Sequence, residues 1–296
     1  MKVSEHGENA LIRLLVKGMG TGAGVLVGPG DDCAVVECCG ASQHGDVQLL
    51  KTDCVIEGIH YAPGLEPQRV GRKAICRVLS DMAAMGGEGR HALVTVMTPP
   101  DRSVDYWRGV YRGLGRVARR FGVEVVGGET SASRHAAISI AMAGCARRGK
   151  VVLRSGGKAG DVLFVTGRLG GSLARKHWAF EPRIAQGLWL AAEGRASAMM
   201  DLSDGLGADL PRLAKASGCG YEVEESAVPR SPGCSVKQAL GDGEDYELLV
   251  AVPQEKARFV ERAWKQKFPR LALTRIGHLL ESPTTRPLSV GGFCHF

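Results

Sequence analysis

The segment Asp201-Leu202-Ser203-Asp204-Gly205-Leu206 sets the expected architecture, because it joins two kinds of secondary structure. The apolar run Ala196–Met200 before it predicts a buried strand, and the apolar spacing after it predicts a helix that ends near Ser217. A turn of acidic residues and glycine therefore links a strand to a helix. The same order, an apolar strand followed by glycine and an acid, recurs along the chain and is typical of an α/β protein.

Further strands and helices alternate on both sides of this segment. In the first half, the predicted strands are Val25–Val27, Ala34–Val36, Val47–Thr52, His91–Met97, Val123–Val126 and Ile138–Gly144. Predicted helices there cover Asn9–Val16, Arg69–Ala84 and Tyr106–Phe121. In the second half, strands are expected at Val162–Thr166, Tyr221–Val223, Glu247–Val252 and Leu273–Ile276, with a turn bracketed by Pro182 and Gly187.

The chain length favours two domains. It has 296 residues, and a domain of this class takes about 150. The polar, basic stretch Ala146–Lys158 separates the two strand-rich halves and predicts a linker. We therefore expect an N-terminal domain over residues 1–146 and a C-terminal domain over residues 147–296.

Composition excludes several classes of protein. Hydrophobic residues make up 44% and charged residues 23%, which excludes a disordered or membrane-embedded chain. The net charge is +7, but the basic runs at 116–120 and 147–150 are short and lack interleaved aromatic residues. A solvated helix face and a linker are therefore favoured over nucleic-acid binding. Nine cysteines without a Cys-x-x-Cys pair, and a start without an apolar core, predict a cytoplasmic protein with reduced thiols and no membrane segment.

Acidic residues recur beside glycine, serine, threonine or cysteine near the ends of apolar or helical runs. They are Asp31, Asp32, Asp53, Asp81, Glu129, Asp201 and Asp204. Each alone is equally typical of a turn or a helix N-cap. Together they predict a shared cleft, where the carboxylates would repel one another without a cation. Mg²⁺ is the natural candidate, because it prefers hard carboxylate oxygens and also bridges phosphates.

Glycine clusters offer backbone N–H groups for phosphate oxygens. Gly167–Ser172 and Gly127-Gly128 are the best candidates for such a nest, and the usual phosphate-loop motifs are missing from the sequence. The acidic stretch Gly241–Glu247 predicts either a solvated hairpin turn or a site for a cationic or polyhydroxylated substrate. His60, taken alone, is more typical of a structural histidine than of a ligand.

Eight motifs, in this order, resemble the thiamine-monophosphate kinase family, ATP-using relatives of aminoimidazole ribonucleotide synthetase and selenophosphate synthetase. The resemblance covers nearly the whole chain. The motifs are Gly28–Ala34, Thr52-Asp53 with Glu57–His60, Leu79–Gly86, Gly127–Thr130, Leu153–Gly156, Val165–Gly167, Asp201–Leu206 and Gly243–Leu248. The last of these separates the thiamine branch from its relatives.

The resemblance implies both a fold and an activity. The fold is of class α/β (α+β), the two-domain aminoimidazole ribonucleotide synthetase-like arrangement. Its N-terminal sheet-and-helix domain binds ATP and Mg²⁺ and pairs with its twin in a homodimer, and its C-terminal α/β domain closes over nucleotide and substrate. The activity is in-line transfer of the ATP γ-phosphoryl group to thiamine monophosphate, without a phosphoenzyme. It is the final step in the biosynthesis of thiamine diphosphate.

The resemblance also implies roles for individual residues. Several Mg²⁺ ions would be held by Asp32, Thr52, Asp53, Asp81, Glu129, Asp201 and Asp204. ATP would be contacted by Gly128, Arg154 and Ser203, and thiamine monophosphate by His60, Glu244 and Phe293. No side chain is expected to act as a general base, because the acceptor phosphate is already ionised near neutral pH.

Two positions depart from the family pattern, and two rival assignments are disfavoured. Glu129 stands where the family has aspartate, and Asp242 stands where it has glycine before Gly243. Selenophosphate synthetase is disfavoured because no Cys-Gly-Cys-Lys-like stretch precedes Gly28. Related maturation factors with a C-terminal cysteine are disfavoured because the sequence ends in Phe296.

Overall fold

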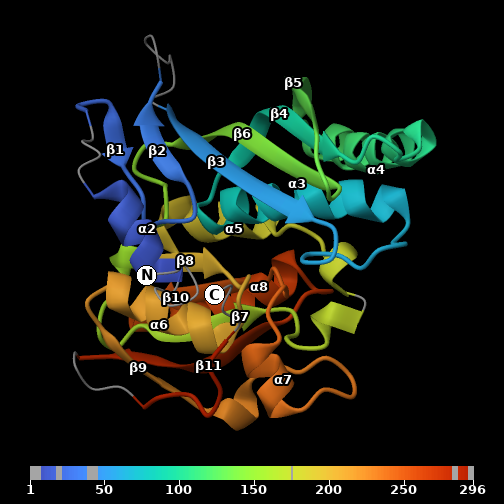
Figure 1. Ribbon diagram of the computed structural model, residues 1–296. Helices are drawn as coiled ribbons and strands as arrows, with labels where there is room; N and C mark the ends of the chain where they lie inside the picture. Colours follow the sequence, from blue (N-terminus) through green and yellow to red (C-terminus); the bar gives the residue numbers. More distant parts are fainter. Residues whose placement is uncertain (1–7, 18–21, 39–45, 175, 282–285, 293–296) are drawn as a thin grey trace.

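The chain forms two β-sheets with helices between and around them (Figure 1). The computed structural model describes residues 8–17, 22–38, 46–174, 176–281 and 286–292. Figure 1 shows the first sheet in the upper half of the molecule and the second in the lower half. Helices α3 (Pro67–Ala84) and α5 (Ile184–Ala191) lie between the sheets and pack against each other. This layered α/β architecture confirms the predicted fold class.

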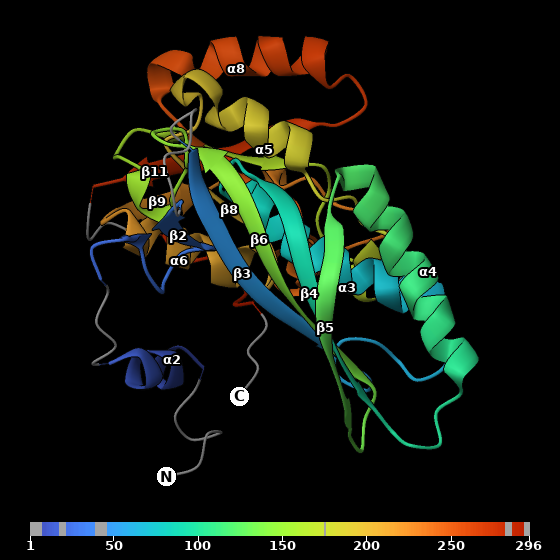
Figure 2. The same cartoon turned by 90° about the horizontal axis from the view of Figure 1, so that it is seen from above.

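The first sheet has the strand order β1-β2-β3-β6-β4-β5. Its strands are β1 Val25–Val27, β2 Ala34–Glu37, β3 Asp46–Ile56, β4 Glu88–Thr98, β5 Glu124–Ala132 and β6 Ala137–Arg147. β4 and β5 are parallel, and the other neighbours are antiparallel. Helices α3 and α4 (Val104–Phe121) cover one face, and Figure 2 shows the sheet from its other, uncovered face. A shorter helix, α2 (Glu8–Val16), precedes β1.

Helix α3 is the most buried helix of the first half, and glycines let its neighbours approach closely. A Cβ on Gly113 of α4 would lie 1.9 Å from the carbonyl oxygen of Gln68, and one on Gly71 of α3 would lie 2.0 Å from that of Val110. Only glycine fits at either contact. The close approach fixes α3 against α4 and leaves the opposite side of α3 to face the second sheet.

The second sheet has the order β8-β10-β7-β11-β9, with every neighbouring pair antiparallel. Its strands are β7 Val162–Thr166, β8 Ala198–Asp201, β9 Gly220–Val223, β10 Leu248–Val252 and β11 Leu273–Leu280. Alternate residues of β10 enter two separate apolar cores. Leu249 packs with residues of α6 (Leu206–Ala216) and α7 (Val236–Gly241), whereas Leu248 packs with residues of α5 and α8 (Gln254–Lys267).

One prediction about local structure is wrong, and one predicted strand is longer than expected. The turn expected between Pro182 and Gly187 is helix α5, and Gly187 lies inside it. A Cβ at Gly187 would lie 2.0 Å from the carbonyl oxygen of Ala83, so this glycine serves the packing of α5 on α3. The strand expected at Val123–Val126 continues through Gly127-Gly128 to Ala132, because those glycines pair with β4.

Among the helices that the structure describes, none combines the length and the hydropathy needed to cross a membrane.

The glycine contact between α3 and α4 gives a stability prediction with an internal control. We expect Gly113→Ala to lower the free energy of unfolding by about 2–3 kcal/mol, because the added methyl meets backbone that cannot move aside. Gly115→Ala, two residues away, meets only the end of the Arg119 side chain at 3.5 Å and should raise it by about 0.5–1 kcal/mol. Urea unfolding checks both, and equal effects of the two substitutions would contradict the close helix contact.

Candidate active site

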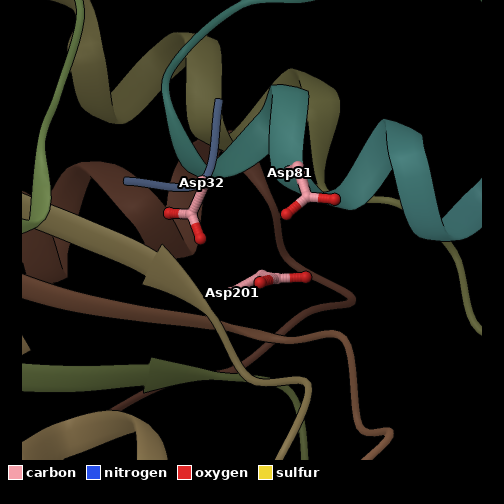
Figure 3. A group of neighbouring side chains, drawn as sticks. All are labelled: Asp32, Asp81 and Asp201. Carbon is pink, nitrogen blue, oxygen red and sulfur yellow. The ribbon is translucent and has the colours of Figure 1, made fainter. Parts of the chain in front are cut away.

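Three buried carboxylates from distant parts of the sequence meet between the two sheets (Figure 3). Asp32 lies in the bend between β1 and β2, Asp81 on α3, and Asp201 at the end of β8. One oxygen atom of each lies within 4.8 Å of the other two. All three side chains are at least nine-tenths buried. Such a group of hard oxygen atoms matches the ligand set of a divalent cation.

The electrostatics of the three carboxylates favour a bound cation. Burial, with the charge of Asp32 as the next cause, raises the pKa of Asp201 to about 7. Burial also raises the pKa of Asp81 well above its usual range, although Lys51 opposes the shift. The Oδ2 atom of Asp32 is buried and has no hydrogen-bond partner among the residues that the structure describes. A buried carboxylate oxygen without a hydrogen-bond partner thus lies beside two carboxyl groups whose pKa values are raised. This arrangement fits Mg²⁺, which would neutralise the repulsion and supply the missing partner.

Basic and hydroxyl side chains of the chain itself partly balance these acids. The Nζ atom of Lys51 lies 2.7 Å from Oδ1 of Asp81, and the Ser80 hydroxyl donates to Oδ2 of Asp201 at 2.6 Å. Arg154, in the short 3₁₀ helix Arg154–Gly156, donates to Asp32. Further ion pairs join Asp53 with Arg77 at 3.2 Å and Asp204 with Arg212.

A cavity of about 460 Å³ opens beside the carboxylates. Among the predicted site residues, its lining includes Asp53, His60, Asp81, Asp201, Ser203 and Asp204. A smaller cavity of about 90 Å³ shares His60, Ser203 and Asp204 with it and adds Glu244. Arg77 lines both cavities. The structure therefore places several predicted metal ligands and the predicted substrate contacts His60 and Glu244 around two cavities that share part of their lining.

Glu244 is held by a buried cluster that sequence reasoning missed. Nζ of Lys73, a fully buried side chain on α3, lies 2.6 Å from Oε2 of Glu244 and 2.7 Å from Nδ1 of His177. Burial opposes ionisation of Glu244, yet His177 and Lys73 together lower its pKa to about 2. Burial lowers the pKa of Lys73 to about 8 in spite of Glu244. Both groups are therefore charged at pH 7.

The backbone at Glu244 is also unusual. Glu244 has φ 52° and Tyr246 has φ 50°, both in the left-handed region that non-glycine residues rarely adopt. Such strain persists only where surrounding contacts hold it, and it clusters at functional sites. The ring of Tyr246 stacks on Phe180 at a centroid distance of 4.0 Å, which supplies one such contact.

The acidic stretch that contains Glu244 is not a solvated turn. Asp245, Tyr246 and Glu247 are each no more than 2% exposed. Arg183 donates to both carboxylate oxygens of Glu247, and Thr166 donates to one of them. The prediction of a hairpin turn is therefore wrong, and the alternative of a site next to substrate remains.

The prediction that two glycine clusters offer free N–H groups to phosphate is wrong as well. The amide of Gly170 donates to Asp245 and the amide of Gly171 donates to Asp242, at 3.0 Å and 2.8 Å. The chain's own carboxylates thus occupy the N–H groups that a phosphate would need. Gly127-Gly128 lies in an extended strand rather than a turn.

Five predicted site residues that the structure describes do not line either cavity. Two of them, Asp32 and Arg154, belong to the carboxylate cluster beside the larger cavity, and the other three, Thr52, Gly128 and Glu129, do not. Thr52 follows Lys51 on β3, so its side chain faces the opposite, uncovered side of the sheet. Gly128 and Glu129 lie on the edge strand β5, which β6 and β4 separate from β3, and Glu129 accepts a hydrogen bond from the backbone N–H of Thr130. Phe293 lies outside the described residues.

Comparisons with known proteins agree on one family. The model of the AIR synthase related protein N-terminal domain matches residues 30–146, and that of the C-terminal domain matches residues 158–287. The thiamine-monophosphate kinase of Rhodopirellula baltica is 34% identical over 86% of this chain and 84% of its own length. That of Aquifex aeolicus is 34% identical over 95% of this chain and 94% of its own.

A solved structure agrees with the sequence comparisons. The structure described as AaThiL complexed with AMPPCP and TMP superposes with a TM-score of 0.87 at 32% sequence identity. The alignment covers 100% of this chain and 99% of that one.

The buried Lys73 gives a prediction about pH. The unfolded chain keeps this proton up to about pH 10.5, whereas the folded chain loses it at about pH 8. The unfolded state therefore binds more protons between these values, and the free energy of unfolding rises there by up to about 3 kcal/mol. We expect Lys73→Met to abolish this rise. Urea unfolding at pH 7.5 and pH 10 checks it, with Lys215→Met, an exposed lysine, as control. A rise of equal size in all three proteins would contradict the assignment.

Proposed function

The chain belongs to the thiamine-monophosphate kinase family, and on that premise we propose that it transfers the γ-phosphoryl group of ATP to thiamine monophosphate at the cavity described above. The observation that carries this proposal is the convergence of Asp32, Asp81 and Asp201 within 4.8 Å beside a cavity that continues to Glu244. The first group suits a metal-bound polyphosphate, and Glu244 suits a cationic substrate. Both requirements of the reaction therefore meet in one place.

Mg²⁺ is the cofactor that we propose for this site. Asp32, Asp81 and Asp201 would hold it, with Asp53 and Asp204 on the wall of the same cavity. When bound, Mg²⁺ neutralises phosphate oxygens and brings the two phosphate-bearing molecules close enough to react. Ser80 orients Asp201 through its hydroxyl, and Arg154 orients Asp32.

The substrate contacts follow from charge and position. Thiamine monophosphate carries a permanently positive thiazolium ring, and Lys73 and His177 keep Glu244 ionised to meet it. His60 lines both cavities and contacts the same substrate. The family resemblance also assigns Phe293, which lies outside the described residues, to this substrate. Arg154 and Ser203 contact ATP. No side chain acts as a general base, because the acceptor phosphate is ionised near neutral pH.

We propose that the protein works as a homodimer through the uncovered face of the first sheet. Leu50, Leu93 and Val126 are 40%, 50% and 57% exposed and line a hollow of about 520 Å³ on that face. Exposed apolar side chains gathered on one sheet face are typical of a protein interface. Thr52 lines the same hollow, and the strand of Gly128 and Glu129 borders it. These three residues contribute to the site in the dimer.

The remaining proposals concern the domain boundary and the compartment. We place the boundary between residues 146 and 147, next to the gap between the two family matches. The seven cysteines that the structure describes are all free thiols, which supports a reducing, cytoplasmic environment.

Replacing one buried carboxylate tests the metal site. We expect Asp201→Asn to lower the rate of thiamine diphosphate formation by about 10³-fold, because the metal loses a charged ligand. The metal-free variant should unfold at the same or a higher temperature, because a buried repulsive charge is removed, and Mg²⁺ should no longer raise that temperature. Chromatography of the products and thermal unfolding check this, with the exposed Asp101→Asn as control. Wild-type activity in Asp201→Asn would remove Asp201 from the metal site.

Replacing one apolar residue of the uncovered face tests the dimer. We expect Val126→Glu to convert the protein to a monomer, because dimerisation would bury an unpaired charge. Activity should fall with it, since Gly128 and Glu129 act only in the dimer. Sedimentation velocity measures the oligomeric state, and Val104→Glu, at the exposed start of α4, is the control. A wild type that sediments as a monomer would contradict the proposal.

A further inference from the structure

Lys51 places a positive charge inside the acidic site. Side chains alternate along β3, so Lys51 shares a face with Asp53 and lies on the side of the sheet that α3 covers. Its Nζ atom lies 2.7 Å from Oδ1 of Asp81, and three-quarters of its side chain is buried. The carboxylates of Asp53 and Asp32 also act on this ammonium group.

The surroundings of Lys51 keep it charged. A lysine ammonium group is ionised at neutral pH, and this one donates a hydrogen bond to Oδ1 of Asp81 at 2.7 Å. The other cations that face this group are Arg77, on Asp53, and Arg154, on Asp32. Asp201 accepts a hydrogen bond from the Ser80 hydroxyl and forms no ion pair with the basic residues that the structure describes. Lys51 is therefore the cation that serves Asp81.

The charge balance of the three-carboxylate cluster depends on this residue. With all three carboxyl groups ionised, Asp32, Asp81 and Asp201 carry three negative charges, and Lys51 with Arg154 supplies two positive ones, which leaves one net negative charge. One divalent ion carries more positive charge than is needed to neutralise this net negative charge. A second divalent ion would be repelled by the ammonium group beside Asp81. With a neutral residue at position 51, the net charge of the ionised cluster would be two negative charges.

We propose that the ammonium group of Lys51 acts as a resident cation of the metal site, taking beside Asp81 the place of a divalent ion that the carboxylates would otherwise bind. The inference rests on the proposed metal-dependent function and deepens it. Lys51 and a metal ion cannot both approach the same oxygen of Asp81 closely, because the ammonium already lies at hydrogen-bond distance. The chain therefore binds fewer, or more weakly held, divalent ions than its carboxylates alone would allow.

Titration with Mn²⁺ in the absence of nucleotide tests this proposal. Wild type, Lys51→Met and Lys51→Arg are compared by electron paramagnetic resonance of free Mn²⁺, with the exposed Lys215→Met as control. Met keeps the length of the side chain without its charge. We expect Lys51→Met to bind one further Mn²⁺ per chain, or the same number at least 10-fold more tightly. Lys51→Arg and Lys215→Met should titrate like the wild type.

Thermal unfolding is a second measurement, which also shows whether the Lys51→Met variant is folded. Metal-free Lys51→Met should unfold at a lower temperature than the wild type, because Asp81 loses its counterion, and Mn²⁺ should raise that temperature by more than it does for the wild type. Equal Mn²⁺ binding and equal thermal shifts in wild type and Lys51→Met would overturn the role of Lys51. If that happened while the wild type still made thiamine diphosphate with Mn²⁺, the proposed function would stand. If no variant bound Mn²⁺, the metal site and this inference would both fall.

Discussion

Mutual repulsion among buried carboxylates is the constraint that organises this molecule. Asp32, Asp81 and Asp201 are drawn from a bend, a helix and a strand end, and each loses hydration when the two sheets close over α3. Charges so close in a poorly hydrated interior are tolerated only when partners of opposite charge face them. Lys51 and Arg154 provide those partners. Lys51 lies on β3 and Arg154 in a 3₁₀ helix, so neither comes from the segments that carry the three carboxylates.

Helix α3 makes the arrangement possible because it serves two purposes at once. Its contacts with α4 and α5 pass through Gly113 and Gly187, where backbone meets backbone with no intervening side chain. The helix is thereby fixed between the sheets. Lys73, Arg77 and Asp81 follow one another at intervals of four residues, so they lie along one side of it. That side contacts Glu244, Asp53 and the metal cluster in turn.

The sequence was informative where the signal was local. The apolar runs located most strands and both long helices of the first half, because burial on a sheet or a helix leaves a periodic pattern. Gly187 misled because a glycine a few residues after a proline resembles the end of a turn, whereas here it allows a helix crossing that only the tertiary structure reveals. Gly170 and Gly171 misled for a similar reason, since the carboxylates that use their amides are more than 70 residues away in sequence.

Site residues divide in the same way. The residue types around Asp32, Asp81 and Asp201 pointed to shared chemistry before any geometry was known. Lys73 was overlooked although a lysine among apolar residues on a buried helix face is itself a signal. His177 gave no such signal, because its contact with Lys73 spans 104 residues. Motifs thus indicate which residues act on the ligands, and only the fold shows which residues keep those groups charged and in place.

Asp201 shows how the same constraint links folding to ligand binding. Its partner is a hydroxyl, and its pKa is raised to about 7 in the folded chain from 3.8, its ordinary value. A raised carboxyl pKa contributes stability at low pH that is lost as pH rises through about 7. A divalent cation reverses this effect, because it favours the ionised carboxylate and binds only the folded arrangement. At neutral pH, therefore, metal binding to Asp201 restores the stability that ionisation of this buried carboxylate removes.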